Sequence, residues 1–474
     1  MASASLLQFS ASTPISSIKP PHLPQFASPI RNPNPRIPNP SLKCASSQTS
    51  LRSNPSTEIL QRPSLTLREI CDGCVPDHVI RRQVCVGFVV ATDVQRQGLP
   101  VMLSGRDCVL HAQTGSGKTL AYLLLIFSII NVQRSVVQAL IVVPTRELGM
   151  QVREILGGFC LSCSDASCKA FDSEAERRVC TVMALLDGGL LRRHKSWLKA
   201  EPPTIVVATM GSLCQMLEKN IFKLEAMQIL VIDEVDFLFN SSKQAYSLRK
   251  LLTSYSSINS RQTIFASASI PQHRRFVYDC IQQKWTKNDV VHVHVNPIEP
   301  MPSLLLHRFV VCNKNERMQT LLSLLQTDGP KTGIIFVGEQ SEKSKKAGNA
   351  PPTTSVIDFL KASYSKCSEI LLLEEEMNFN LRAASLSEVR QGGDCLLVAT
   401  DMAARGVDLT ETTHIYNFDL PRTAVDYLHR AGRTGRKPFS NENCTVTSII
   451  TAEERFALQR FENELMFRSQ ELTL

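Results

Sequence analysis

The sequence predicts an α/β protein with two domains, each a mostly parallel sheet flanked by helices. From about residue 64, short and wholly apolar runs alternate with helical patterns. Runs of this kind indicate strands that are buried on both faces, as in parallel sheets. The chain has 474 residues, more than a single hydrophobic core usually supports. A proline-rich stretch near the middle separates two such series of runs.

The first 57 residues differ in composition from the rest of the chain. They contain no Asp or Glu, are rich in Ser and Pro, and carry five Lys or Arg residues. A basic, acid-free leader without a long apolar core is typical of an organelle transit peptide, which we expect at 1–57. Its prolines disfavour a long amphipathic helix, which favours the chloroplast stroma over the mitochondrion. An ordinary disordered tail is the alternative.

Composition also limits the partners and the redox state. The net charge of +8 falls to +3 without the five leader charges, so a polyanion must bind a locally basic face. No run of eighteen apolar residues occurs, and no membrane span is expected. We expect the fifteen cysteines to be mostly thiols. One cluster has a spacing unlike paired zinc ligands, which favours a Cys-bearing insertion over a metal site; it comprises Cys160, Cys163, Cys168 and Cys180.

The first domain is expected over 58–295. It contains five apolar runs that we interpret as strands, with helical patterns between them, such as 121–130. The expected strands are Cys108–Leu110, Ala139–Val143, Ile205–Ala208, Leu230–Ile232 and Thr263–Ala266. A segment with three prolines in eight residues then forms the expected linker, 296–303.

The second domain is expected over 304–474 and repeats the pattern, with helices at 316–325 and 452–465. The expected strands are Arg308–Val311, Ile334–Val337, Ile370–Leu373, Leu396–Ala399, His414–Asn417 and Val446–Ile450. A polar stretch at 339–354 is expected to be an exposed loop. This half of the chain has no phosphate-binding loop of its own.

The stretch HAQTGSGKTL at 111–120 matches the phosphate-loop pattern G-x-x-x-x-G-K-[ST], with Ala112 in the place of the first Gly. It follows an apolar run and opens an apolar helix, whose positive end favours an anion. Lys118 would bind the β- and γ-phosphates, and the Thr119 hydroxyl would bind Mg²⁺. A Gly-rich turn that only resembles such a loop is the alternative. The expected nucleotide contacts are Ala112, Gln113, Thr114, Gly115, Ser116, Gly117, Lys118 and Thr119.

The segment LVIDEVD at 230–236 places carboxylates at the end of a buried run. A carboxylate in this position is a natural Mg²⁺ partner for Thr119. Asp233 would hold the metal through water, and Glu234 would orient or deprotonate the attacking water. A strand end that only turns polar is the alternative, but the position 115 residues after Lys118 favours the functional interpretation.

With these motifs the chain resembles the DEAD-box RNA helicases of superfamily 2, which contain two tandem RecA-like domains. The resemblance runs from about Leu65 to the C-terminus. It implies an ATP-dependent helicase that unwinds or remodels short RNA duplexes. The matching motifs, in family order, are GFVVATDVQ (87–95), AQTGSGKT (112–119), PTREL (144–148), Gly188-Gly189, ATMGSL (208–213), DEVD (233–236), SAS (267–269), IIFVG (334–338), ATDMAARGVDL (399–409) and HRAGRTGR (429–436).

The resemblance implies further roles at the ATP site. Gln95 would bond the two-sided donor and acceptor edge of adenine. Asp408 would accept a hydrogen bond from the ribose. Arg433 and Arg436 would reach the γ-phosphate as arginine fingers, for which a guanidinium fork is suited. Since the fingers and the loop belong to different domains, hydrolysis would require domain closure.

RNA contacts are expected to involve mainly phosphate and 2′-OH groups. The candidates by motif are Pro144, Thr145, Arg146, Gly189, Thr209 and Gly211 in the first domain, and Arg382 and Thr400 in the second. Ser267 and Ser269 would couple the ATP site to domain closure. Organellar ribonucleoproteins are candidate partners, and a monomer is expected.

Several positions depart from the family pattern. Ala91 replaces a proline, Val235 an alanine, and Met210 and Ser212 the Pro and Arg of a T-P-G-R-L motif. The upstream aromatic residue expected to stack on adenine is not evident, and Leu67 is the nearest candidate. Loss of the arginine removes an expected phosphate contact. This altered motif and the mild net charge favour one alternative, an ATP-dependent RNA clamp with little unwinding. A DNA helicase on the same frame is a further alternative, which the RNA-type motif set disfavours.

Overall fold

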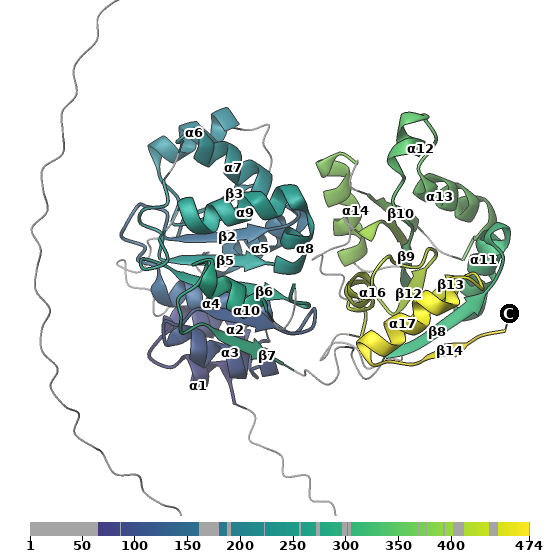
Figure 1. Cartoon of the computed structure of the whole chain (residues 1–474), viewed down its shortest axis with the longest axis horizontal. Coiled ribbons are helices and arrows are strands. Elements are labelled where there is room, and N and C mark those ends of the chain that lie inside the picture. The colour runs from purple at the N-terminus through teal and green to yellow at the C-terminus, as the bar shows by residue number, and fades with distance from the viewer. Residues whose placement is uncertain are drawn as a thin grey trace, which may run out of the picture. The chain divides into compact units, whose positions relative to one another are not determined.

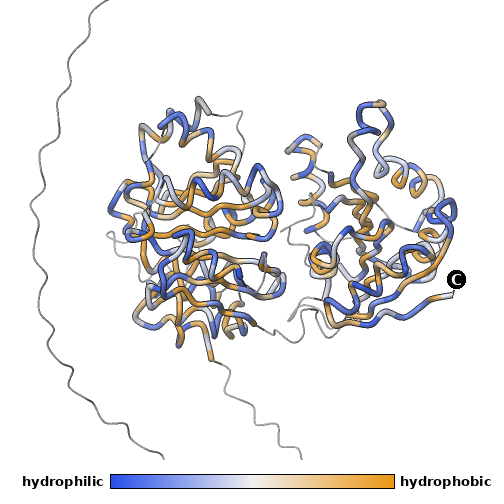
Figure 2. The backbone as a smooth tube through the Cα atoms, viewed as in Figure 1, coloured by the Kyte–Doolittle hydropathy of each residue, from blue (hydrophilic) through white to orange (hydrophobic). Residues whose placement is uncertain are grey.

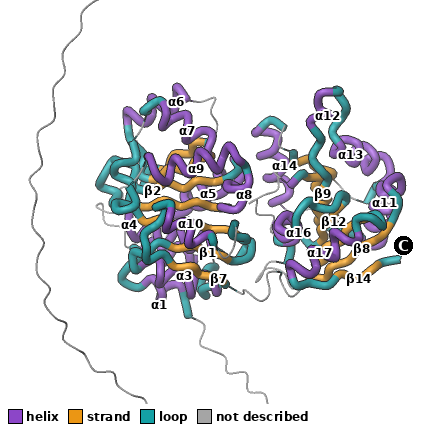
Figure 3. Tube along the Cα trace, viewed as in Figure 1, coloured by secondary structure: helices purple, strands orange, loops and turns teal. Residues whose placement is uncertain are grey.

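The computed structural model contains two seven-stranded sheets with helices on both faces (Figure 1). It describes residues 65–85, 87–160, 180–186, 191–221, 223–255, 257–271, 275–295, 301, 305–366, 369–374, 377–391, 394–401, 412–435 and 444–473. The expected leader, nearly all of the linker, and Cys163 and Cys168 of the cysteine cluster lie outside these residues. In each domain the strands form the central layer and the helices cover it (Figure 3).

Three helices precede the first sheet: α1 (Leu67–Cys71), α2 (Asp77–Cys85) and α3 (Asp93–Leu103). The first begins at a capping box, in which Glu69 N donates to Thr66 Oγ1 at 3.2 Å and Thr66 N donates to the Glu69 carboxylate at 2.8 Å. Thr92 N likewise donates to Gln95 Oε1 at 2.9 Å at the start of α3. The second cap fixes where α3 begins and places Gln95 in the first turn of that helix.

The first sheet has the strand order β3-β4-β2-β5-β6-β1-β7, with every pairing parallel. Because all its strands run the same way, their carboxyl ends meet at one edge, which is where ligands bind in such sheets. The strands are β1 (Cys108–His111), β2 (Ala139–Val143), β3 (Val182–Leu185), β4 (Ile205–Thr209), β5 (Ile229–Asp233), β6 (Gln262–Ser267) and β7 (Val291–His294).

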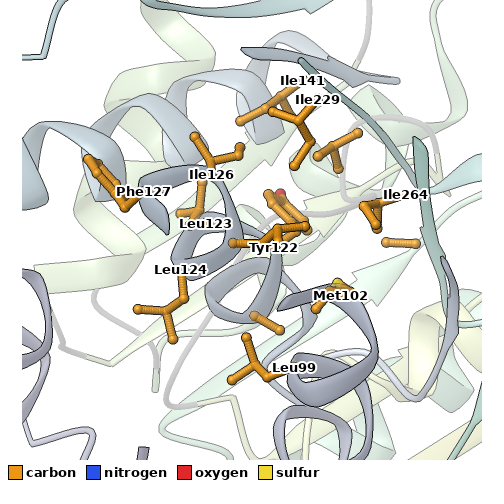
Figure 4. Packing of buried hydrophobic residues seen from close by; sticks show 14 of the residues in the cluster. Leu99, Met102, Tyr122, Leu123, Leu124, Ile126, Phe127, Ile141, Ile229 and Ile264 are labelled. Atoms are coloured by element: carbon orange, nitrogen blue, oxygen red, sulfur yellow. The ribbon is translucent and has the colours of Figure 1, made fainter. Parts of the chain in front are cut away.

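Helices cover both faces of this sheet, and α4 contributes a continuous run of buried residues, 121–127, to one core. The helix α4 buries Tyr122, Leu123 and Ile126 against Leu99 of α3 and against the sheet (Figure 4). Its sequence is apolar all round because it packs on both the sheet and α3. The helices are α4 (Lys118–Ile129), α5 (Arg146–Cys160), α6 (Leu191–Ala200), α7 (Met210–Glu218), α8 (Val235–Asn240), α9 (Ser242–Ser254) and α10 (Phe276–Gln282).

The second sheet has the order β10-β11-β9-β12-β13-β8-β14 and repeats the first topology strand for strand. Its strands are β8 (Leu305–Val311), β9 (Thr332–Phe336), β10 (Glu369–Leu373), β11 (Cys395–Ala399), β12 (His414–Asn417), β13 (Cys444–Ile450) and β14 (Ser469–Glu471). Its helices are a 3₁₀ turn (Lys314–Glu316), α11 (Arg317–Asp328), α12 (Glu342–Lys346), α13 (Pro352–Ser363), α14 (Phe379–Gln391), α16 (Ala424–Ala431) and α17 (Arg455–Leu465). The predicted fold class, two mostly parallel sheets flanked by helices, is confirmed.

The prediction of an exposed loop at 339–354 is wrong in part. The segment is largely exposed, but it contains α12 and the start of α13. Ser341 Oγ accepts a hydrogen bond from Ser344 N at 3.2 Å and caps the first of these helices. Pro352 occupies the first turn of the second, where a missing N–H is harmless. The prediction of a loop relied on the polar composition and did not take into account the two helix-start signals, Ser341 and Pro352.

Hydropathy follows the layers, with apolar residues concentrated along the strands and polar residues on the outer loops (Figure 2). The cysteines in the described part of the chain are all free thiols, and six of them are buried. None of the described helices combines the length and the apolar character needed to cross a membrane.

Candidate functional site

The phosphate loop leaves β1 and ends where α4 begins. Gly117 has φ +95°, and a Cβ at this position would lie 2.6 Å from Gln95 Nε2. Only glycine fits this conformation and this close approach. The Lys118 ammonium is buried and donates to the Ala112 and Gln113 carbonyl oxygens at 2.6 and 2.8 Å. In this structure Lys118 therefore closes the loop on itself.

The phosphate loop carries a buried ammonium group and two buried hydroxyl groups. Burial lowers the pKa of Lys118, and the nearby Glu234 and Asp233 carboxylates oppose that shift. Thr114 Oγ1 and Ser116 Oγ are buried and have no hydrogen-bond partner among the described residues. Buried hydroxyls are nearly always paired in native proteins. One ammonium and two unsatisfied hydroxyls in a Gly-rich loop are suited to a bound phosphate.

Gln95 joins α3 to the phosphate loop. Its side chain is 2% exposed, its Oε1 accepts from Thr92 N, and its Nε2 donates to Gly117 O at 3.2 Å. A primary amide has two N–H donors and two acceptor lone pairs, so one of each remains. That pair suits the edge of adenine. Leu67 is fully buried in the hydrophobic core at the start of α1.

The strand β5 ends at Asp233, which is buried. Its Oδ2 accepts a hydrogen bond from the Tyr122 hydroxyl at 2.8 Å. Burial, followed by repulsion from Glu234, raises the pKa of Asp233 to about 6. Glu234 has φ +48°, a left-handed conformation that is unusual for a residue with a side chain. Strain of this kind concentrates at functional sites.

Asp236 is the point where three motifs meet. Ser267 Oγ donates to its Oδ1 at 2.5 Å, and Ser269 Oγ donates to its Oδ2 at 2.8 Å. His429 Nε2 of α16 lies 2.9 Å from the same Oδ2 and is the donor, because a carboxylate only accepts. Ser267 Oγ also lies 3.5 Å from Glu234 Oε2. The carboxylate pair and the two serines therefore belong to one buried network.

The second domain brings a cation to the same network. Arg433 is 2% exposed, and its Nε donates to His429 O at 3.1 Å. Its positive charge is among the causes that lower the pKa of Lys118. A Cβ at Gly432 would lie 3.1 Å from Thr114 Cβ, so this turn approaches the phosphate loop. Arg436, Asp408 and Gly189 lie outside the described residues.

The first-domain RNA candidates lie at the carboxyl ends of β2 and β4. Pro144, Thr145 and Arg146 are half-buried, and Thr145 Oγ1 accepts from Leu148 N at 3.3 Å where α5 starts. Thr209 is also half-buried at the end of β4, and Gly211 is exposed one residue into α7. The structure places these residues at the edge of the sheet that carries the phosphate loop.

The two second-domain candidates are buried. Arg382 of α14 forms a buried ion pair with Glu147 of α5, with 3.0 Å between Nη2 and Oε1. Its guanidinium is therefore engaged by a carboxylate in this structure. Thr400 follows β11, and its buried hydroxyl has no hydrogen-bond partner in the described part of the chain. The family motifs predicted that Arg382 and Thr400 contact RNA, but no pattern in the sequence indicated that Arg382 pairs with Glu147.

Three side chains that contact candidate site residues were not predicted from the sequence. Tyr122 orients Asp233, His429 donates to Asp236, and Glu147 pairs with Arg382. Tyr122 is the only hydroxyl-bearing aromatic residue in an otherwise apolar helix segment, which is a weak signal for a buried hydrogen bond. The other two contacts join residues more than 190 positions apart, and no local pattern announces them.

Comparisons with known proteins agree with this arrangement. The DEAD/DEAH box helicase family matches residues 92–276, and the helicase conserved C-terminal domain matches 313–438. The chain is 64% identical over 430 residues to DEAD-box ATP-dependent RNA helicase 58, chloroplastic, of Arabidopsis thaliana, which covers 91% of this chain and 89% of that protein. It is 63% identical over 413 residues to the protein of the same name from Oryza sativa subsp. japonica, covering 87% and 90%.

Solved structures share the fold. The DEAD-box helicase Mss116 bound to ssRNA and UDP-BeF matches with a TM-score of 0.73 at 21% identity, covering 86% of this chain and 81% of that one. Dbp5 of S. cerevisiae bound to RNA and ADP BeF3 matches with a TM-score of 0.68 at 18% identity, covering 84% and 94%. At these identities the likeness establishes the architecture alone.

Proposed function

This chain belongs to the DEAD/DEAH box helicase family and is an ATP-dependent RNA helicase with two tandem RecA-like domains, and from that premise we propose how its residues divide the work. The observation that carries the proposal is the meeting of Lys118 with Asp233 and Glu234 at the carboxyl edge of the first sheet. The phosphate-binding lysine and the carboxylates assigned to the metal and the attacking water thus belong to one site.

The loop residues fit a nucleotide phosphate and a magnesium ion. The unpaired hydroxyls of Thr114 and Ser116 and the Lys118 ammonium are donors for phosphate oxygens. The Thr119 hydroxyl would bind Mg²⁺ directly and Asp233 would hold it through water, since Mg²⁺ prefers oxygen ligands. The ion supplies charge neutralisation at the β- and γ-phosphates when bound. The Tyr122 hydroxyl fixes the direction in which Asp233 faces.

Glu234 orients or deprotonates the attacking water, and Arg433 stabilises the charge that develops on the γ-phosphate. We assign the same finger role to Arg436. Gln95 uses its remaining donor and acceptor on adenine, and Asp408 accepts from the ribose. Among the described residues, Gln95, Glu234 and Arg433 are held in place by contacts with other parts of the protein. This preorganisation lowers the reorganisation needed in the transition state.

Coupling between ATP and RNA runs through Asp236. Ser267, Ser269 and His429 all donate to this carboxylate. Because His429 belongs to the second domain, movement of that domain changes the hydrogen bonds next to Glu234. RNA binds along the carboxyl ends of β2 and β4 and across the second domain, through phosphate and 2′-OH contacts. The residues assigned to it are Pro144, Thr145, Arg146, Gly189, Thr209, Gly211, Arg382 and Thr400.

The relatives named as chloroplastic support a chloroplast location for this chain. We assign it to the stroma, with 1–57 as the transit peptide, 58–295 and 304–474 as the two domains, and 296–303 as the linker. The acid-free leader supports this division. Organellar ribonucleoproteins are the proposed partners, and the protein acts as a monomer.

The test is ATP turnover by residues 58–474, with and without RNA, beside the Glu234→Gln variant. We expect RNA to stimulate turnover and the substitution to abolish it while nucleotide binding stays intact. A short duplex with a labelled strand then measures ATP-dependent unwinding. Turnover that ignores RNA, or that survives in Glu234→Gln, contradicts the proposal.

One observation favours a second candidate function, an ATP-dependent RNA clamp. Ser212 stands where the family pattern has an arginine, is buried, and accepts a hydrogen bond from Thr209 Oγ1 at 3.2 Å. Met210 beside it is also buried. This turn therefore offers RNA no cation with which to bend a strand. Tight ATP-dependent RNA binding without strand separation would favour the clamp, and efficient unwinding would exclude it.

A further inference from the structure

Three histidines lie together at the edge of the first sheet, outside the ATP network. The strand β7 is the edge strand and pairs in parallel with β1 (Figure 3). His111 ends β1 and stands opposite His294 in the register, while Val109 stands opposite His292. Because side chains alternate along a strand, His111, His292 and His294 point to the same face. No role in ATP or RNA binding follows from their positions.

The three imidazole rings are almost parallel. The centroids of His111 and His294 lie 3.8 Å apart, and His292 lies 5.6 Å from each of them. One ring nitrogen from each residue lies within 4.8 Å of the other two. Neutral imidazole is the form that binds a metal ion.

We propose that His111, His292 and His294 form a binding site for one divalent transition-metal ion of the Zn²⁺ class. Imidazole nitrogens suit Zn²⁺, Co²⁺, Ni²⁺ and Cu²⁺. With metal–nitrogen bonds of 2.0–2.1 Å, two ligands of a tetrahedral ion are about 3.4 Å apart. Because the rings are nearly parallel, their in-plane lone pairs do not meet at one point, and binding requires each ring to turn about its side-chain bonds until one nitrogen faces the ion. His111 is buried, whereas His292 and His294 are half-buried on the edge strand, which gives the ion an entry path.

The ligand type separates this site from the nucleotide-bound magnesium. Mg²⁺ prefers oxygen ligands and gives up water reluctantly, so three imidazoles do not attract it. The position also ties the site to the loop, since Ala112 follows His111 directly and its N–H donates to Ser267 O at 3.2 Å. A metal held at His111 therefore fixes the strand end from which the phosphate loop starts. Metal and nucleotide affinities should depend on each other by the same factor.

The test uses the full chain with no histidine tag, reduced and in excess Mg²⁺. Co²⁺ is the probe, with a competing chelator to set the free concentration, and Zn²⁺ is then used to displace it. We expect one Co²⁺ with a nitrogen-type visible spectrum and no thiolate charge-transfer band, which excludes binding by cysteines. The ligand variants are His292→Gln, His294→Gln and the double variant. The matched control is His78→Gln, an exposed helix histidine of the same domain.

Removing a group that only supports a metal ligand costs about 10–100-fold in affinity, so loss of a ligand should cost at least about tenfold. We expect each single variant to show that loss, the double variant to lose the Co²⁺ spectrum, and the control to match wild type. Circular dichroism and thermal melting of the metal-free variants check that they fold. Wild-type affinity in the double variant, or a spectrum carried by thiolates, overturns the site. If the double variant does not fold, the Co²⁺ affinities of the two single variants decide: wild-type affinity in both overturns the site.

Discussion

At the scale of single residues, the hydroxyl of Tyr122 helps to keep Asp233, the proposed magnesium ligand, ionised. It donates to Asp233 Oδ2, and this bond favours the ionised form against burial. With a pKa of about 6 in the free protein, Asp233 is ionised above that pH and protonated below it. Only the ionised form serves Mg²⁺, so ATP turnover at limiting Mg²⁺ should fall as the pH is lowered through about 6.

The variant Tyr122→Phe removes the donor and should raise the pKa of Asp233 further. A hydrogen bond to a charged group contributes about 1.5 kcal/mol, which corresponds to about one pH unit. We expect the acid limb of the turnover profile to move by about that amount to higher pH. The matched control is Tyr416→Phe, which removes a similar bond to Asp328 in the second domain. An unmoved limb in Tyr122→Phe would falsify the role of this hydroxyl.

Gly117 provides a second prediction at this scale. Gly105 has φ +82° with open space around it, whereas Gly117 has φ +95° and the Gln95 amide at 2.6 Å from an added Cβ. Both Ala variants carry backbone strain, but only Gly117→Ala also pushes Gln95 out of place. We expect Gly117→Ala to weaken ATP binding at least about tenfold and Gly105→Ala to lower only stability. Titration with a fluorescent ATP analogue measures the first effect. Equal nucleotide affinity in the two variants would count against the close approach.

Many residues of the site could be predicted because each belongs to a local pattern. Lys118 and Thr119 are set by the spacing of a single loop, and Asp233 by its place after an apolar run. The partners that hold these groups could not be predicted in the same way. The hydrogen bond from Tyr122 spans 111 positions, and that from His429 to Asp236 spans 193. Only folding brings such pairs together, and no spacing rule encodes them.

At the scale of elements, the Asp107 carboxylate fastens the start of β1 to its neighbours. It is fully buried, and it accepts from Thr263 N of β6 at 2.8 Å and from Lys287 N before β7 at 2.7 Å. Burial raises the pKa of this carboxyl, and the two hydrogen bonds offset only part of that effect. The strand that leads to the phosphate loop is thereby fixed at its beginning as well as at its end.

The variant Asp107→Ala leaves two backbone donors without a partner, each at a cost of about 1–3 kcal/mol. We expect the first domain to lose about 2–5 kcal/mol of unfolding free energy. Tryptophan fluorescence isolates that domain during urea unfolding, because both tryptophans, Trp197 and Trp285, belong to it. The control is the exposed Asp289→Ala, which should change stability by less than about 1 kcal/mol. A wild-type transition for Asp107→Ala would show that water replaces the lost carboxylate.

Strands buried on both faces could be predicted, whereas of the edge strands β3, β7, β10 and β14 only β10 was predicted. The strands β2 and β12 begin and end at the residues expected from their apolar runs. By contrast, β3, β7 and β14 were missed. β3 alternates buried and half-buried positions, and β7 carries two histidines, because an edge strand needs only one apolar face. The short runs of these strands offer too few residues for either period to be recognised.

At the scale of the whole chain, both domains share one topology. Only in the first does the strand in the β1 position lead into the candidate phosphate loop. The strand β8 occupies the place of β1 in the second sheet and leads to a capped 3₁₀ turn instead of a Gly-rich loop. The sequence predicted this division, since one phosphate loop is easy to see and its absence in the second half is equally plain. The contacts that join the two halves had no such signal.

The last prediction concerns the ion pair between Glu147 and Arg382, which joins α5 to α14. Both side chains are buried, and removing one partner of a buried pair costs about 3 kcal/mol or more because a charge is left uncompensated. We therefore expect Glu147→Gln and Arg382→Gln each to weaken ATP-dependent RNA binding about 100-fold, and the double variant to lose far less than the product. Fluorescence anisotropy of a labelled RNA with a non-hydrolysable ATP analogue measures all four affinities. The exposed pair Glu154 and Arg390, at 3.4 Å, is the control and should show a coupling below about 0.5 kcal/mol. Additive losses at the buried pair would mean that Arg382 acts on RNA independently of Glu147, and the ion pair would then have no part in coupling the two domains.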